Sequence, residues 1–129
     1  MATWDDVRRI ALSLPETNEQ IKRDHAHWQV KDKLFVWERP LRGSDLKALG
    51  ESAPGGPILG ARVEHEIAKQ ALIADDPDVF FTTPHFDGYP AILVQLEKIS
   101  AKNLEEVIVE AWLCRAPTRL AQEYLASSQ

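Results

Sequence analysis

The chain has 129 residues, a net charge of −5 and 44% hydrophobic residues, with a single cysteine, Cys114, that excludes an internal disulfide. This length suits one domain with its own core, and we expect residues 1–129 to form it. The apolar runs are far shorter than the roughly 20 residues that span a bilayer, and the first residues contain no leader-like pattern, so the sequence predicts a cytoplasmic protein without a membrane partner.

The N-terminal part reads as a helix followed by strands. Thr3 with Asp6 three residues later resembles a capping box, and apolar residues then recur at helical spacing until Pro15. From Glu19 to Trp37 the apolar pattern changes to a period of two. This change predicts strands, with a hairpin turn near Lys31-Asp32.

The middle of the chain is rich in turn-forming residues. Glycine and proline recur between residues 40 and 57, with one short helix expected around Asp45 to Leu49. Ile58 to Val63 has the composition of another strand. Alanine and leucine then predict a helix over Glu66 to Ala74, which ends before Pro77.

The most informative segment runs from Val79 to Leu96. Phe80 to Thr83 and Ala91 to Leu96 contain strand-forming residues on either side of a polar kink. Pro84 ends the first strand, and Asp87-Gly88 is typical of a turn. We name residues 82–89 the elbow, and the pattern predicts a strand, the elbow and a second strand.

The C-terminal part predicts helices. Ser100 suits an N-cap for a helix with an apolar stripe from Leu104 to Trp112, and a shorter helix is expected from Thr118 to Leu125. Taken together, the elements predict an α+β fold with an antiparallel sheet and helices packed on one face. The expected order is roughly α-β(3)-α-β(2)-α.

Four segments together resemble the MmcQ/YjbR family: Leu14-Pro15-Glu16, Lys33-Leu34-Phe35, the run from Phe80 to Pro90, and Ala111-Trp112. The resemblance extends over nearly the whole chain, and the elbow is its most specific part. It implies a compact α+β fold like that of secretion chaperones. It also implies a DNA-binding function, by analogy with a double-wing shape. No enzymatic activity comes with the resemblance, and we expect no cofactor.

A basic segment is the candidate DNA contact. Residues 22–47 contain seven lysines and arginines against four carboxylates, although the whole chain is acidic. Basic residues that alternate with apolar residues on a strand are also typical of a solvated sheet face. We expect any DNA binding to be weak and salt-sensitive. The predicted contacts are Lys22, Arg23, Lys31, Lys33, Arg39 and Arg42.

The elbow is the alternative site, of a different class. A small-molecule or protein-binding pocket there would use Thr83, His85, Asp87 and Tyr89 as polar contacts. The competing interpretation is a turn whose polar side chains bond to its own backbone.

The histidines are the candidate ligands for a metal centre. His25 and His27 share one face if their segment is extended, and His85 would complete three zinc ligands if the fold brought it near. Because no zinc-binding spacing accompanies them, we predict no metal. The sequence has neither a nucleophile-elbow pattern nor a phosphate-binding glycine loop, and it does not predict an enzyme.

Overall fold

The computed structural model describes residues 2–127. Six strands form one antiparallel sheet in the order β1-β2-β3-β4-β6-β5, which confirms the predicted α+β class. Two short 3-10 helices, η1 (Gly50–Ser52) and η2 (Pro84–Phe86), lie in the connections. The other elements are α1 (Trp4–Leu12), β1 (Thr17–Lys22), β2 (His25–Val30), β3 (Lys33–Glu38), α2 (Gly43–Leu49), β4 (Ile58–Arg62), α3 (Glu66–Asp75), β5 (Phe80–Phe81), β6 (Ala91–Gln95), α4 (Ala101–Arg115) and α5 (Thr118–Ser127).

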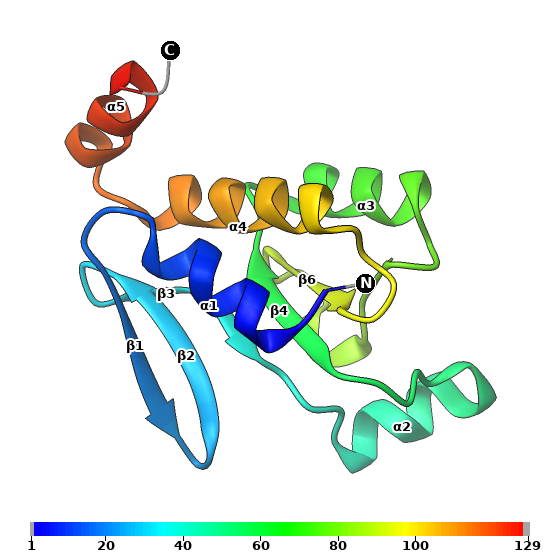
Figure 1. Cartoon of the computed structure of the whole chain (residues 1–129). Helices are drawn as coiled ribbons and strands as arrows, with labels where there is room; N and C mark the ends of the chain where they lie inside the picture. The colour runs from blue at the N-terminus through cyan, green and yellow to red at the C-terminus, as the bar shows by residue number, and fades with distance from the viewer. Residues whose placement is uncertain (1, 128–129) are drawn as a thin grey trace.

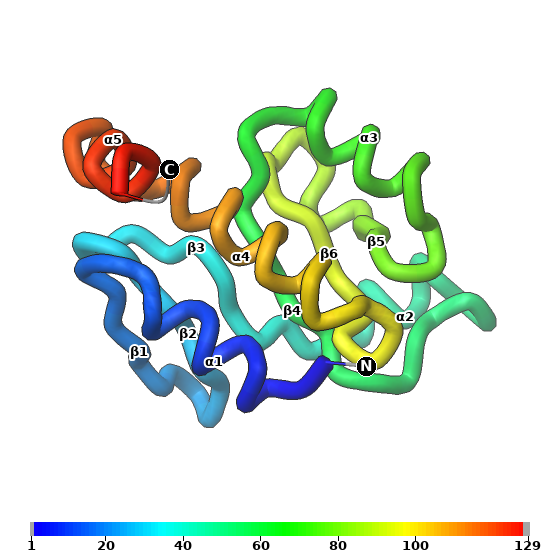
Figure 2. The backbone as a smooth tube through the Cα atoms, turned by 45° about the horizontal axis from the view of Figure 1, so that its top comes forward, coloured from blue at the N-terminus to red at the C-terminus, as the bar shows by residue number. Residues whose placement is uncertain are grey.

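The main core lies between one face of the sheet and a layer of helices. Figures 1 and 2 show α4 crossing this face with α1 on one side and α3 on the other. Trp28 and Leu59 from the sheet pack with Leu104 and Trp112 from α4, and all four are fully buried. Their burial removes large apolar surfaces from water and is the main stabilising term of the fold. The predicted helix layer on one face is therefore confirmed.

A smaller apolar cluster lies on the opposite face of the sheet. Trp37, Ile58, Phe86, Ala91 and Leu93 form its buried part. Strand alternation explains the division, because successive residues such as Ile58 and Leu59 point to opposite faces. Phe86 belongs to the elbow, so the elbow covers the β4 and β6 part of this face.

A bulge in β3 adjusts which side chains reach this second face. Trp28 pairs with Val36 while Gln29 pairs with Leu34, so Phe35 is an extra residue on β3. Residues three apart on a regular strand point to opposite faces, but the extra residue brings Leu34 to the same face as Trp37. Both belong to the second cluster.

Two tight hairpins connect the first three strands. Lys31 and Asp32 have φ values of 49° and 68°, which confirms the predicted turn. Arg23 and Asp24 have φ values of 52° and 68° and form a second turn of the same kind. Consecutive left-handed residues match the twist of a two-residue hairpin, and here they carry charged side chains instead of glycine. The sequence analysis did not separate β1 from β2 and so missed the second turn.

Gly60 is the position where the second face tolerates no side chain. It pairs with Trp37 across β3 and β4, and a Cβ atom there would lie 2.4 Å from Trp37 Cε2. We expect Gly60→Ala to lower the free energy of unfolding by about 1–3 kcal/mol, because the indole must move in a packed cluster. Urea denaturation measures the change. Gly43→Ala is the control, since a Cβ there meets nothing within 4 Å; equal effects of the two substitutions would contradict the prediction.

Candidate functional site

A cleft of about 800 Å³ opens on the second face of the sheet. The tip of the β1–β2 hairpin borders it on one side, and His85, Phe86 and Tyr89 of the elbow border it on the other. Leu34 and Trp37 provide an apolar floor, while the segment after β3 closes one end. The bulge in β3 therefore matters for the site, because it places both floor residues on this face.

Three cations at the cleft are available to a ligand. Lys22, Arg23 and Arg42 line it, are exposed, and form no ion pair among residues 2–127. A fourth, Arg39, is only 5% exposed. Its Nη2 lies 3.0 Å from Asp45 Oδ2, and its guanidinium lies 5.1 Å from the centre of the Phe86 ring. Arg39 thus fixes the cleft wall, whereas the other three remain free to bind an anion.

Asp45 anchors this wall as a buried carboxylate. Besides its ion pair with Arg39, it accepts a 2.9 Å hydrogen bond from the backbone amide of Arg42. Burial by itself would raise the pKa of this carboxyl, but the Arg42 amide and the charge of Arg39 outweigh burial. The pKa of Asp45 therefore lies below its ordinary value, and the group stays ionised when buried.

Three histidines line the same cleft: His25, His27 and His85. His25 Nδ1 donates to Glu38 Oε2 at 3.2 Å, which fixes the orientation of that ring. Burial, followed by the nearby charges of Lys22 and His25, lowers the pKa of His27, so this imidazole is neutral at neutral pH. His85 packs edge-on against Phe86 with ring centres 4.9 Å apart. Within residues 2–127, no group of three or more His, Cys, Asp or Glu side chains is arranged to hold a metal ion.

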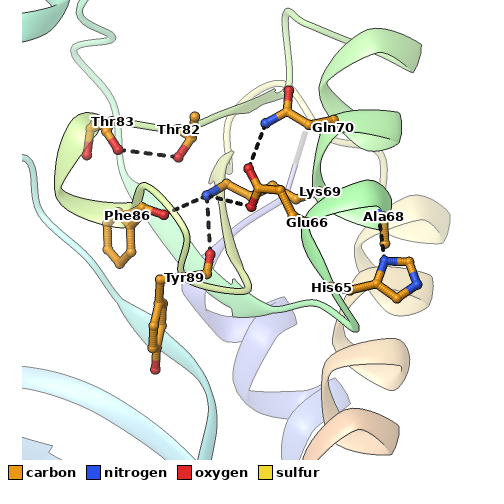
Figure 3. A network of polar contacts seen from close by, with 9 residues as sticks. All are labelled: His65, Glu66, Ala68, Lys69, Gln70, Thr82, Thr83, Phe86 and Tyr89. Carbon is orange, nitrogen blue, oxygen red and sulfur yellow. Dashed lines mark hydrogen bonds and ion pairs between the residues drawn. The ribbon is translucent and has the colours of Figure 1, made fainter.

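A buried lysine holds the elbow in place. Lys69 on α3 is 1% exposed, and its Nζ donates to the carbonyl oxygens of Phe86 at 2.7 Å and Tyr89 at 3.2 Å (Figure 3). Its charge is balanced by Glu66, whose Oε2 lies 3.7 Å away. Each of these carbonyls also accepts one backbone amide within the turn, from Tyr89 and Ala91 respectively, and the lysine gives each a second hydrogen bond. It thereby positions the two aromatic side chains at the cleft.

Tyr89 forms the outer edge of the elbow wall. Its hydroxyl accepts a 2.9 Å hydrogen bond from Arg62 Nη1, and the Arg62 guanidinium lies 5.0 Å from the centre of its ring. The side chain is still 43% exposed. Arg62 therefore fixes the ring while one of its faces remains open to solvent.

The structure merges two candidate sites that the sequence kept apart. Four of the six predicted basic contacts, Lys22, Arg23, Arg39 and Arg42, line the cleft together with His85 and Tyr89 of the elbow. The other two elbow residues do not line the cleft: Asp87 is exposed elsewhere, and Thr83 is buried. Lys31 and Lys33 lie at the opposite end of their strands, where Lys31 Nζ is 3.7 Å from Glu16.

Sequence reasoning missed three residues that shape the cleft. Glu38 and Lys69 looked like ordinary surface charges, since nothing in the local pattern shows that one orients a histidine or that the other is buried. Trp37 is the third, and it is buried while it also forms part of the cleft floor.

Comparison with known proteins identifies the family. A family model described as YjbR matches residues 12–114. The chain belongs to the YjbR family. This confirms the resemblance found in the sequence, and the match includes the elbow and all of the cleft-lining residues.

Relatives of this YjbR protein occur in mycobacteria. A solved structure from another bacterium has the same fold as this chain. It is 57% identical to uncharacterized protein Mb2600 of Mycobacterium bovis and 57% identical to uncharacterized protein Rv2570 of Mycobacterium tuberculosis, in each case over 99% of both chains. The crystal structure of Deinococcus radiodurans protein DR2400, whose domain is named DUF419, matches with a TM-score of 0.68 and 18% identity. That match covers 98% of this chain and 89% of the other, and it shows a common fold. Within residues 2–127, no helix is long and apolar enough to cross a membrane.

Replacement of the buried lysine should loosen the elbow. Lys69→Met removes the side-chain donor that the carbonyls of Phe86 and Tyr89 share and leaves them only their backbone donors, so we expect the free energy of unfolding to fall by about 2 kcal/mol. Amide hydrogen exchange of residues 86–91 should accelerate in the same variant. Gln70→Met on the exposed side of α3 is the control; unchanged exchange in Lys69→Met would show that the lysine does not hold the elbow.

The Asp45 carboxylate should make stability depend on pH. Because its pKa is lower in the folded chain than in the unfolded chain, its contribution is complete above the unfolded value of about 4 and disappears as the pH falls through the folded value. We expect Asp45→Asn to cost about 3 kcal/mol near neutral pH, because Arg39 is left buried and unpaired. Urea denaturation at neutral and strongly acidic pH measures both proteins. The difference between them should shrink in acid, and a constant difference would be incompatible with this role.

Proposed function

We propose that this YjbR protein binds a phosphate-bearing ligand in the cleft, and that a nucleic-acid single strand is the form that uses the cleft best. The observation that carries the proposal is the convergence of the basic segment and the elbow into one cleft. Lys22, Arg23 and Arg42 supply free positive charge there, although the chain as a whole carries a net charge of −5. A local positive field in an acidic protein draws anions to one place.

Apolar and aromatic walls favour a strand over a bare anion. The half-exposed Tyr89 stands beside the cations, whereas Phe86 is buried against Arg39. A base has a flat face that can stack on the tyrosine ring. Proteins that bind single strands combine these two features, a cationic groove for the backbone and aromatic platforms for the bases. DNA is thus proposed as a partner in its single-stranded form.

The division of the basic residues argues against a duplex lying along the sheet. Lys31 and Lys33 lie at the β2–β3 turn and do not line the cleft, and Lys31 faces Glu16. Arg39 is engaged with Asp45. The remaining cations border a concave site, whereas a duplex requires cations spread along an exposed face.

A small phosphorylated molecule is the second candidate. The cleft volume of about 800 Å³ lies within the range of small-molecule sites, and its mixture of apolar walls with a few polar groups is typical of them. Competition by a mononucleotide against a labelled strand distinguishes the candidates. A mononucleotide that binds as tightly as the strand would favour the small molecule.

Charge reversal at the hairpin tip tests the cleft as the binding site. We expect Lys22→Glu/Arg23→Glu to weaken binding of a fluorescein-labelled single-stranded DNA at least tenfold at low salt, because phosphate contacts are lost. The slope of log affinity against log salt concentration should also fall by about 1 to 2. Fluorescence anisotropy titrations at several salt concentrations measure both quantities.

The matched control reverses two lysines at the other end of the same sheet. Lys31→Glu/Lys33→Glu changes the net charge by the same amount, and these residues do not line the cleft. It should bind nearly as well as the unmodified protein. Equal losses in the two variants would mean that only net charge matters, and no binding at low salt would refute the proposal.

A further inference from the structure

We propose that the cleft cleaves single-stranded RNA, with His27 as general base and His25 as general acid. The inference rests on the proposed function, since it requires a phosphate strand in the cleft. It assigns a role to two histidines that line this cleft. The binding of an anion does not by itself account for their presence there.

The two imidazoles are placed to flank one phosphodiester. They stand two apart on β2, with their partners Lys22 on β1 and Trp37 on β3, so their side chains share one face and their Cα atoms are separated by roughly 7 Å. His25 is 41% exposed in its side chain and therefore accessible. A pair at this separation can reach an attacking and a leaving oxygen on opposite sides of the same phosphorus.

The environments of the two rings differ in the way that an acid–base pair requires. Glu38 Oε2 lies 3.2 Å from Nδ1 of His25, which fixes the orientation of that ring and leaves its Nε2 without a partner among the described residues. Among residues 2–127 His27 forms no ion pair. Burial is the largest cause that lowers its pKa, Lys22 and His25 act in the same direction, and the more distant charge of Glu38 opposes them, so the ring is able to accept a proton. Different environments for two like groups commonly separate their catalytic roles.

The cleft itself points to a substrate that supplies its own nucleophile. Among the described residues that line it there is no serine, threonine or cysteine, and the hydroxyl of Tyr89 is bound to Arg62. RNA carries such a group in its 2′-hydroxyl, whereas DNA does not. RNA is therefore the nucleic acid on which these residues can act without a further reactant.

The cleavage step needs no reactant besides the RNA and the two histidines. Neutral His27 takes the proton of the 2′-hydroxyl as O2′ forms a bond to phosphorus. The bond from phosphorus to O5′ breaks, and imidazolium His25 gives its proton to the leaving O5′. The products are a 2′,3′-cyclic phosphate and a 5′-hydroxyl, and proton exchange with water restores both rings. Lys22, Arg23 and Arg42 would stabilise the charge that develops on the phosphoryl oxygens.

Single-turnover cleavage of a short fluorescein-labelled oligopyrimidine RNA tests the inference, with mass spectrometry to identify a cyclic phosphate end. His27→Ala and His25→Ala should each slow cleavage at least a hundredfold. Both should still bind the corresponding 2′-deoxy strand, which cannot react. The rate of the unmodified protein should depend on pH as a bell, and His27→Ala should lose the acidic limb.

Other titrating or charged groups near His25 and His27 also affect the pH profile. These are Lys22 and Arg23 on the hairpin, Glu38 at the end of β3, Arg39 and Arg42 after it, and His85 and Tyr89 on the elbow. His65→Asn is the matched control, because His65 lies outside the cleft and caps α3, where its Nδ1 accepts from the amide of Ala68. Asparagine retains the cap, so this variant should cleave at the rate of the unmodified protein.

The outcomes separate this inference from the proposed function. Binding of the deoxy strand without RNA cleavage would overturn the inference and leave the binding function standing. Cleavage that persists in His27→Ala would also overturn it, because a contaminating nuclease would explain the activity. No binding of either strand at low salt would refute both.

Discussion

The amine of Lys69 is buried beneath the elbow, where it donates to the carbonyl oxygens of Phe86 and Tyr89. A charged amine is costly to remove from water. Two carbonyls and Glu66 surround the Lys69 amine and offset the cost of its burial. This contact joins α3, on the helix side of the sheet, to a turn that faces the other side. The second apolar cluster and one wall of the cleft depend on it, because Phe86 belongs to both.

The cleft concentrates positive charge in an acidic protein by separating its cations into two kinds. Arg39 is neutralised by Asp45 and fixes the wall, and Arg62 holds the ring of Tyr89. Lys22, Arg23 and Arg42 have no such partner among the described residues and face the space between hairpin and elbow. The same residue type thus serves as framework in one place and is left unpaired among the described residues in another, and only burial and pairing distinguish the two.

The sequence predicted most of the fold because its signals are local. Helical spacing after Thr3 and Ser100, strand alternation, and the turn at Lys31-Asp32 each depend on a few neighbouring residues, and the structure contains all of them. The site depends on contacts between distant segments. No local pattern indicates that His85 reaches the face of His25 and His27, or that a bulge at Phe35 turns Leu34 toward Trp37.

The backbone at the hairpin tip places one cleft residue in a conformation that side chains with a Cβ atom rarely adopt. Arg23 has a φ of 52°, a left-handed conformation that costs a side chain with a Cβ atom about 1–2 kcal/mol and that glycine adopts freely. A sequence selected only for stability would place glycine or asparagine here. The arginine therefore exchanges conformational ease for a charge at the mouth of the cleft, and stabilising mutations found at this turn would be expected to reduce ligand affinity.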